Sequence, residues 1–207
     1  IMLIDFKDPE KPIYLKTITK FGERGFVDGV NAVGLTQICS GANRGKYLFV
    51  CGGSGGSELI FGISSGYDLR DPNLTINLFG IVTIPDSGNR IGETINLVRD
   101  RDGKIYFISF TNDDEVPNSG TDRAWLFDVV GGDGGITDVT RGRYVILDDL
   151  PSGDYGDVKA AACAYVSPSG RLILYSACHS DYCRGIIFVP TKDCREGYVK
   201  MGEFASK

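Results

Sequence analysis

Three stretches of the sequence repeat one pattern, and this repetition constrains the fold more than any other feature. They are NRGKYLFVC (43–51), DRDGKIYFIS (100–109) and SPSGRLILYS (167–176). Each stretch begins with a glycine-containing tight turn and continues into a run of aromatic and aliphatic residues. Repeats spaced by a few tens of residues are typical of radial or solenoidal arrays. We therefore expect several copies of one small structural unit.

The apolar runs around each repeat indicate four consecutive strands per unit. We place complete units at 30–84, 93–149 and 158–204, and a half unit at about 1–20, all within one segment covering 1–207. Four antiparallel strands in about 50 residues are typical of a β-propeller blade. A β-sandwich or two small barrels also contain short strands with frequent turns, but the repeated four-strand order favours blades. The sequence predicts an all-β fold, a β-propeller of three four-stranded blades plus a half blade.

Three and a half blades do not close a ring, because propellers usually have about 4–8 blades. An open arc would leave apolar strand edges exposed, which soluble proteins avoid or cover. We expect the remainder of the ring to come from a longer polypeptide or from a partner chain. The start of the chain at Ile1 favours the longer polypeptide.

Composition excludes some classes of partner. The chain has 42% hydrophobic residues, a net charge of −5 and 28 glycines, which suit a soluble core with many turns. No apolar run approaches the ~18–20 residues of a membrane-spanning helix. The basic residues are dispersed, so we expect no nucleic-acid partner.

The six cysteines bear on the cellular compartment. Cys178 and Cys183 bracket HSDY at the end of an expected strand, where a hairpin loop would bring the two thiols together as a disulfide. A disulfide favours an extracellular or periplasmic protein. His179, within this loop, is the only histidine. It could join the cysteines as a metal ligand, but a surface turn closed by a disulfide is favoured.

The segment LIDFKDPEKPIYLKTI (3–18) resembles the repeat of the LVIVD family of β-propellers. In that repeat a strand ending in Asp is followed by an Asp-Pro turn, a second Pro and another strand. The matching residues here are Ile4, Asp5, Asp8, Pro9 and Pro12. The resemblance covers about sixteen residues and implies a propeller, and members of the family are mostly surface or extracellular proteins without an assigned reaction.

A second stretch, GKYLFVCGGSGGSELIFGISSGYDLRDP (45–72), looks like a blade of the five-bladed glycoside hydrolases. The resemblance implies carboxylates at the starts of the inner strands, acting as acid and base on a glycosidic bond. The corresponding positions here hold Asn31, Glu93 and Lys159. Only Glu93 could serve as a catalytic group, and one carboxylate is not a pair.

In a propeller, the loops that enter the innermost strands face one mouth of the central channel. Polar and charged residues at these equivalent places could hold a polar ligand, or they could simply cap a solvated funnel. They are Asp28, Asn31, Arg90, Glu93, Asp157 and Lys159.

Two kinds of loop complete the set of candidates. The acidic loop TNDDEVPNSGTD (111–122) has clustered oxygens that could hold Ca²⁺, although its spacing matches no EF-hand or RTX loop. We otherwise expect no metal or cofactor. GGSGG (52–56) and GGDGG (131–135) are interpreted as hairpin tips, since neither precedes the GK[ST] of a phosphate-binding loop.

The sequence as a whole predicts an extracytoplasmic binding or scaffold module with a glycan or protein ligand at the channel mouth. The alternative is a glycoside hydrolase-like enzyme on the same frame, with Glu93 as its carboxylate. Enzymatic activity is left open.

Overall fold

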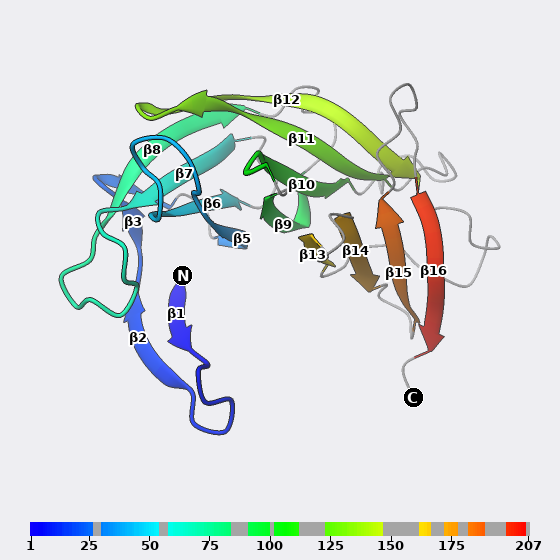
Figure 1. Cartoon of the computed structure of the whole chain (residues 1–207), viewed down its shortest axis with the longest axis horizontal. Helices are drawn as coiled ribbons and strands as arrows, with labels where there is room; N and C mark the ends of the chain where they lie inside the picture. The colour runs from blue at the N-terminus through cyan, green and yellow to red at the C-terminus, as the bar shows by residue number, and fades with distance from the viewer. Residues whose placement is uncertain are drawn as a thin grey trace.

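The computed structural model describes residues 1–26, 30–53, 58–83, 91–99, 102–111 and 123–146, and four later strands at 162–166, 172–177, 182–188 and 198–205. These residues form sixteen strands and no helix, which confirms the prediction of an all-β chain (Figure 1). Within this described part, no helix is long and apolar enough to cross a membrane.

Three four-stranded antiparallel sheets form most of the molecule, and in each the strands pair in the order of the sequence. The first sheet contains β5 (Val30–Gln37), β6 (Tyr47–Gly53), β7 (Glu58–Ser64) and β8 (Ile76–Thr83). The second contains β9 (Ile91–Arg99), β10 (Ile105–Thr111), β11 (Arg123–Gly132) and β12 (Gly135–Ile146). The third contains β13 (Ala162–Val166), β14 (Leu172–Ala177), β15 (Tyr182–Phe188) and β16 (Tyr198–Ala205). The expectation of four-stranded antiparallel units is confirmed.

Two short hairpins precede these sheets. Strands β1 (Met2–Asp5) and β2 (Ile13–Thr17) pair antiparallel, and so do β3 (Lys20–Phe21) and β4 (Arg24–Gly25). The β1–β2 hairpin is the structural counterpart of the half unit expected at the N-terminus.

The local chemistry of the repeated pattern explains its hairpins. Gly45 and Gly103 have φ angles of 90° and 88°, a left-handed conformation that residues with a Cβ rarely adopt. Each lies in the turn that leads into the second strand of its sheet. The apolar run of β7 is buried at six successive positions, as expected for a strand covered on both faces of its sheet.

The sheets follow one another around an arc (Figure 1). Their first strands lie side by side, with β5 against β9 and β9 against β13. Gly34 on β5 permits the close approach to β9, since a Cβ at this position would lie 2.9 Å from the backbone nitrogen of Leu97. Across the described residues the arc does not close, and it is open between the β1–β2 hairpin and the third sheet (Figure 1).

Apolar cores lie between successive members of the arc. One core joins the first sheet to the second and is centred on Phe61, Phe107 and Phe127. The other joins the N-terminal hairpins to the opposite face of the first sheet. In this second core Phe21 is fully buried, and its ring occupies the space left by Gly62, where a Cβ would lie 2.7 Å from the ring.

Candidate functional site

Two of the predicted site residues lie on described strands. Asn31 belongs to β5 and Glu93 to β9. Gly34 on β5 lies against Leu97 on β9, and further along both strands Arg99 Nη1 donates to the Gln37 carbonyl at 2.9 Å. Because residue numbers increase together along the two strands, β5 and β9 run in the same direction. The backbone therefore places Asn31 and Glu93 at the same end of two neighbouring strands.

The other four predicted ligand-binding residues lie outside the described residues. They are Asp28, Arg90, Asp157 and Lys159. The acidic loop proposed for calcium also lies outside, from position 112 onward. Among the side chains that the structure describes, no group of three or more His, Cys, Asp or Glu residues could hold a metal ion.

The predicted disulfide falls at the turn between β14 and β15. Cys183 lies on β15 and its backbone pairs with Ala177, whereas Cys178 is outside the described residues. The disulfide thus stays a prediction. Cys39 and Cys51, whose side chains are described, are free thiols. Burial raises the pKa of Cys51 to about 12, so this thiol is protonated and unreactive at neutral pH.

A pocket of about 370 Å³ lies at the opposite end of the same strands, between the first and second sheets. Its walls come from the β5–β6 turn, the β9–β10 turn and the β11–β12 hairpin. The floor is apolar and continues the core between the two sheets. The apolar lining residues are Ile38, Leu48, Phe79, Ile105, Val129 and Ile136.

The β11–β12 hairpin tip is attached to the β5–β6 turn by polar contacts. Asp133 Oδ1 accepts the amide N–H of Ala42 at 2.8 Å, and the carbonyl of Asp133 accepts Asn43 Nδ2 at 2.9 Å. Gly41 makes room for this contact, because a Cβ there would overlap the Asp133 carboxylate. The interpretation of GGDGG (131–135) as a hairpin tip is confirmed by the pairing of Gly132 with Gly135.

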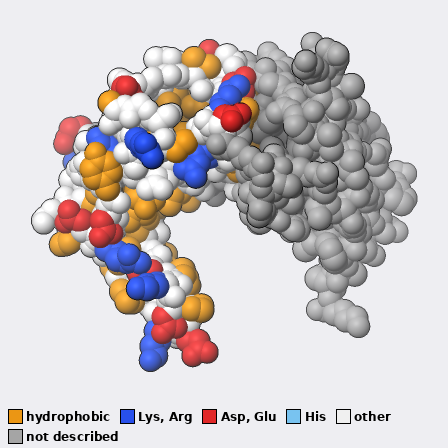
Figure 2. Space-filling view, viewed as in Figure 1, with side chains coloured by type: hydrophobic (Ala, Val, Ile, Leu, Met, Phe, Trp, Pro, Cys, Tyr) orange, Lys and Arg blue, Asp and Glu red, His pale blue; other side chains and the backbone are white. Residues whose placement is uncertain are grey.

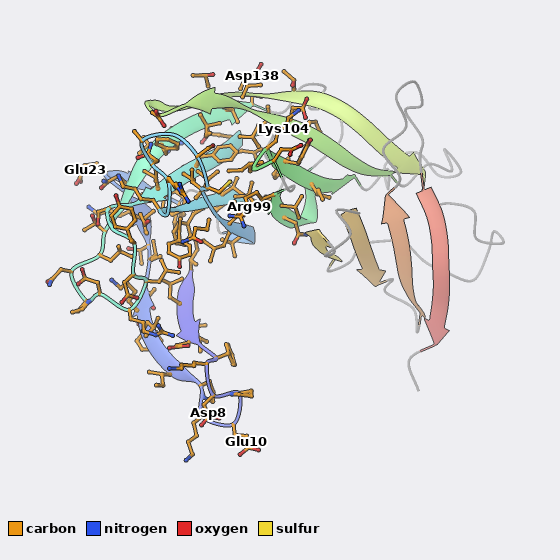
Figure 3. The ribbon with its side chains drawn as sticks, viewed as in Figure 1. Asp8, Glu10, Glu23, Arg99, Lys104 and Asp138 are labelled. Carbon is orange, nitrogen blue, oxygen red and sulfur yellow. The ribbon has the colours of Figure 1, made fainter. Side chains whose placement is uncertain are left out.

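Lys104 contributes the positive charge at the rim of the pocket. Its Nζ lies 2.9 Å from Asp128 Oδ1 and 4.9 Å from the centre of the Tyr106 ring. Lys104 and Arg99 come from the two sides of the β9–β10 turn (Figure 3). The lysine is thus held at the rim by an ion pair and a cation–π contact.

The pocket suits binding better than acid–base catalysis. Among its described lining residues Asp133 is the only carboxylate, and its Oδ1 is already bonded to a backbone amide. Glycoside hydrolysis needs two carboxyl groups on either side of the scissile bond. An apolar floor with backbone and lysine donors at the rim can instead hold a small amphipathic group.

Sequence reasoning did not find this pocket. The signal was present in two glycine-containing turns, one at the start of the repeat at 43–51 and one at GGDGG (131–135), which were interpreted only as separate turns. What brings them together is the packing of one sheet against the next, since Asp133 and Ala42 are 91 residues apart in the chain.

No protein-family model matches the chain, and no curated protein matches it either.

Proposed function

We propose that the chain is part of a β-propeller that acts as a binding or scaffold module outside the cytoplasm, with its ligand at the channel mouth. The observation that carries the proposal is the side-by-side, same-direction arrangement of β5 and β9. In a propeller the first strand of every blade lines the channel, so the loops that enter these strands converge on one mouth.

The packing between sheets supports the propeller arrangement. Each face of the first sheet carries its own apolar core, one shared with the next sheet and one with the N-terminal hairpins. Stacking of successive sheets face to face around an axis is how blades bury their apolar residues. The β1–β2 hairpin also resembles the LVIVD turn in its sequence, with a strand ending at Asp5 and the next beginning at Ile13.

The exposed face of the N-terminal hairpin supports a longer arc. Met2, Ile4 and Phe6 are alternate residues at β1, so they lie on the face opposite the buried Leu3. Their exposed fractions are 67%, 41% and 61%. Tyr14, opposite Ile4 across the hairpin, is 59% exposed. Figure 2 shows hydrophobic surface along this hairpin. A further sheet stacked on this face would bury these side chains, as the first sheet buries Leu3.

Binding can be tested with the purified chain on arrays of defined oligosaccharides and of peptides, followed by titration calorimetry of each hit. We expect Asn31→Ala and Glu93→Gln to weaken binding by about tenfold or more, which corresponds to about 1.4 kcal/mol. Glu10→Gln is the matched control, because Glu10 lies at the tip of the β1–β2 hairpin, far from the strand starts (Figure 3). Equal loss in the control, or no binding to either array, would overturn the proposal.

The same samples distinguish a binding module from a hydrolase. Turnover of a bound glycan by the unmodified chain, lost in Glu93→Gln with binding retained, would show that the chain is an enzyme rather than a binding module.

The cellular compartment can be tested through the predicted disulfide. Mass spectrometry of an oxidised sample should find Cys178 and Cys183 linked. Free thiols at both positions would remove the support for export.

A further inference from the structure

Strand β1 has one hydrogen-bonded neighbour in the described structure and one free edge. It pairs with β2 alone, and it lies on the inner side of β2 in the arc (Figure 1). Ile1 and Ile18 exchange both backbone hydrogen bonds, at 2.8 and 2.7 Å. In an antiparallel ladder the next residue points its N–H and C=O the other way. The backbone groups of Met2 therefore face the free edge.

The first sheet is unevenly covered on the face that meets this hairpin. Across β5 and β6, Val33 pairs with Cys51 and Leu35 pairs with Phe49, so the four side chains share one face. Cys51 and Phe49 are 2% and 1% exposed, whereas Val33 and Leu35 are 43% and 42% exposed. On this face the side chains of β6 are covered, whereas those of β5 are not.

The cover comes from the N-terminal hairpins. Leu3 on β1, Ile18 after β2 and Phe21 on β3 pack against Phe49 and the strands beyond it. A two-stranded hairpin reaches only part of the way across a four-stranded sheet. The uncovered strand is the innermost one, and β1 presents its free edge on that same inner side.

The hairpin is held in place by contacts to the long loop between β7 and β8. Asp5 Oδ2 lies 2.6 Å from Arg70 Nε. Lys16 Nζ donates to the carbonyls of Asp71 at 2.8 Å and Leu74 at 2.9 Å. The free edge of β1 is therefore fixed relative to the first sheet, which lowers the ordering cost of adding a strand to it.

We propose that the free edge of β1 accepts a β-hairpin from protein outside residues 1–207. Its outer strand pairs antiparallel with β1 through the backbone groups of Met2, and its inner strand covers Val33 and Leu35 with aliphatic side chains. This addition gives a four-stranded sheet, like the three complete sheets of the chain. Strand addition combines backbone pairing for affinity with alternate side-chain contacts for specificity. The proposal rests on the propeller arrangement proposed above.

The chain itself supplies a probe for this site. Residues 30–57 contain the inner hairpin β5–β6 and the segment that joins it to the third strand of its sheet. A second copy of 30–57, fused before Ile1, would occupy the two missing positions. Hydrogen exchange should then show protection of the Met2 amide by at least about tenfold, and the thermal midpoint should rise by about 4 °C or more.

Met2→Pro in the fused chain is the control for edge pairing. Proline removes the N–H that faces the edge and leaves the β1–β2 hydrogen bonds in place, so we expect the thermal gain to disappear. Met2→Ala, which keeps the N–H, should retain most of it. An equal effect of both substitutions would contradict pairing at this edge.

A synthetic peptide of residues 30–53, added in excess to the unmodified chain, provides the same readout if the fusion does not fold. Absence of Met2 protection with the peptide would overturn the proposal, and so would a folded fusion without protection. A dimer of the unmodified chain by light scattering, dissociated by Met2→Pro, would also overturn it and identify a second copy as the occupant. These outcomes are independent of the array binding that tests the proposed function.

Discussion

The two faces of the first sheet are built from the same four strands and are covered to different extents. On one face, Leu48, Val50 and Phe61 are at most 1% exposed beneath the second sheet. On the other face, cover by the N-terminal hairpins leaves the innermost strand partly open, with Val33 and Leu35 more than 40% exposed. The complete second sheet covers its face, whereas the two short N-terminal hairpins cover only part of theirs.

This difference shows that the unit of burial is the complete sheet. Val33 and Val50 are both aliphatic residues on neighbouring strands, yet their exposures are 43% and 0%. Their own strands do not decide this. How far the neighbouring layer extends across the sheet does, and the predictions that follow test that explanation.

The largest effect is expected at Phe61, in the fully covered core. Phe61→Ala removes a ring that is 0% exposed, and loss of a buried Phe side chain costs about 3–5 kcal/mol in unfolding free energy. Chemical denaturation followed by fluorescence measures this change. A loss below about 1 kcal/mol would mean that the first and second sheets do not share a packed core.

Gly34 tests how closely the inner strands must approach. A Cβ at this position would lie 2.9 Å from the backbone nitrogen of Leu97 and 3.0 Å from Val50 Cγ1. Gly34→Ala should therefore cost about 1–3 kcal/mol through overpacking. Gly25→Ala is the control, because no atom lies within 4 Å of a Cβ there. Equal denaturation midpoints for the two variants would contradict close packing of β5 on β9.

The attachment of the less covered hairpin should depend on pH. The hydrogen bond from Arg70, followed by the amide N–H of Lys7, lowers the pKa of Asp5 below its usual value. The ionised carboxylate is therefore favoured in the folded state. Its stabilising contribution is complete above the pKa of the unfolded chain and disappears as the pH falls through the lower folded value.

Thermal midpoints measured from pH 6 to 2.5 can test this dependence. Asp5→Asn should lower the midpoint slightly at pH 6 and flatten the acid decline, since its amide does not titrate. Asp102→Asn serves as the control at an exposed turn position. An unchanged acid profile in Asp5→Asn would show that the Asp5–Arg70 pair does not hold the hairpin.

The smallest effect is expected on the open side of the first sheet. Leu35→Gln replaces a side chain that is 42% exposed and should change the unfolding free energy by no more than about 0.5 kcal/mol. In the chain fused to a second copy of 30–57, the same change should cost more than about 1 kcal/mol, because the side chain would then be buried. Equal costs in the two backgrounds would mean that the added strands do not cover this position.

Much of the fold could be predicted from local patterns. The turn glycines Gly45 and Gly103, followed by aliphatic and aromatic runs, predicted hairpins that the structure confirms. β-branched and aromatic residues bounded by glycine turns specify strands through short-range sterics, so their signal is present in a few neighbouring residues. Strands that are neighbours in the sequence also pair in each four-stranded sheet, so the predicted strand order agrees with the observed one.

The candidate sites were less accessible to this reasoning. Asn31 and Glu93 were chosen by their equivalent places in two units, and the backbone does put them at one end of adjacent strands. The pocket beside Asp133 and Lys104 was not foreseen, because its walls come from three turns that are about 30 to 90 residues apart in the chain. Only the packing of one sheet on another brings such turns together.

The sequence by itself determined that this chain forms antiparallel sheets of four strands joined by tight turns, because strand propensity and turn geometry act over a few residues. Tertiary structure alone decided which faces of those sheets are buried, where the pocket forms and which edge stays free. Burial depends on the neighbouring layer, and no residue carries information about its neighbouring layer in its own local pattern.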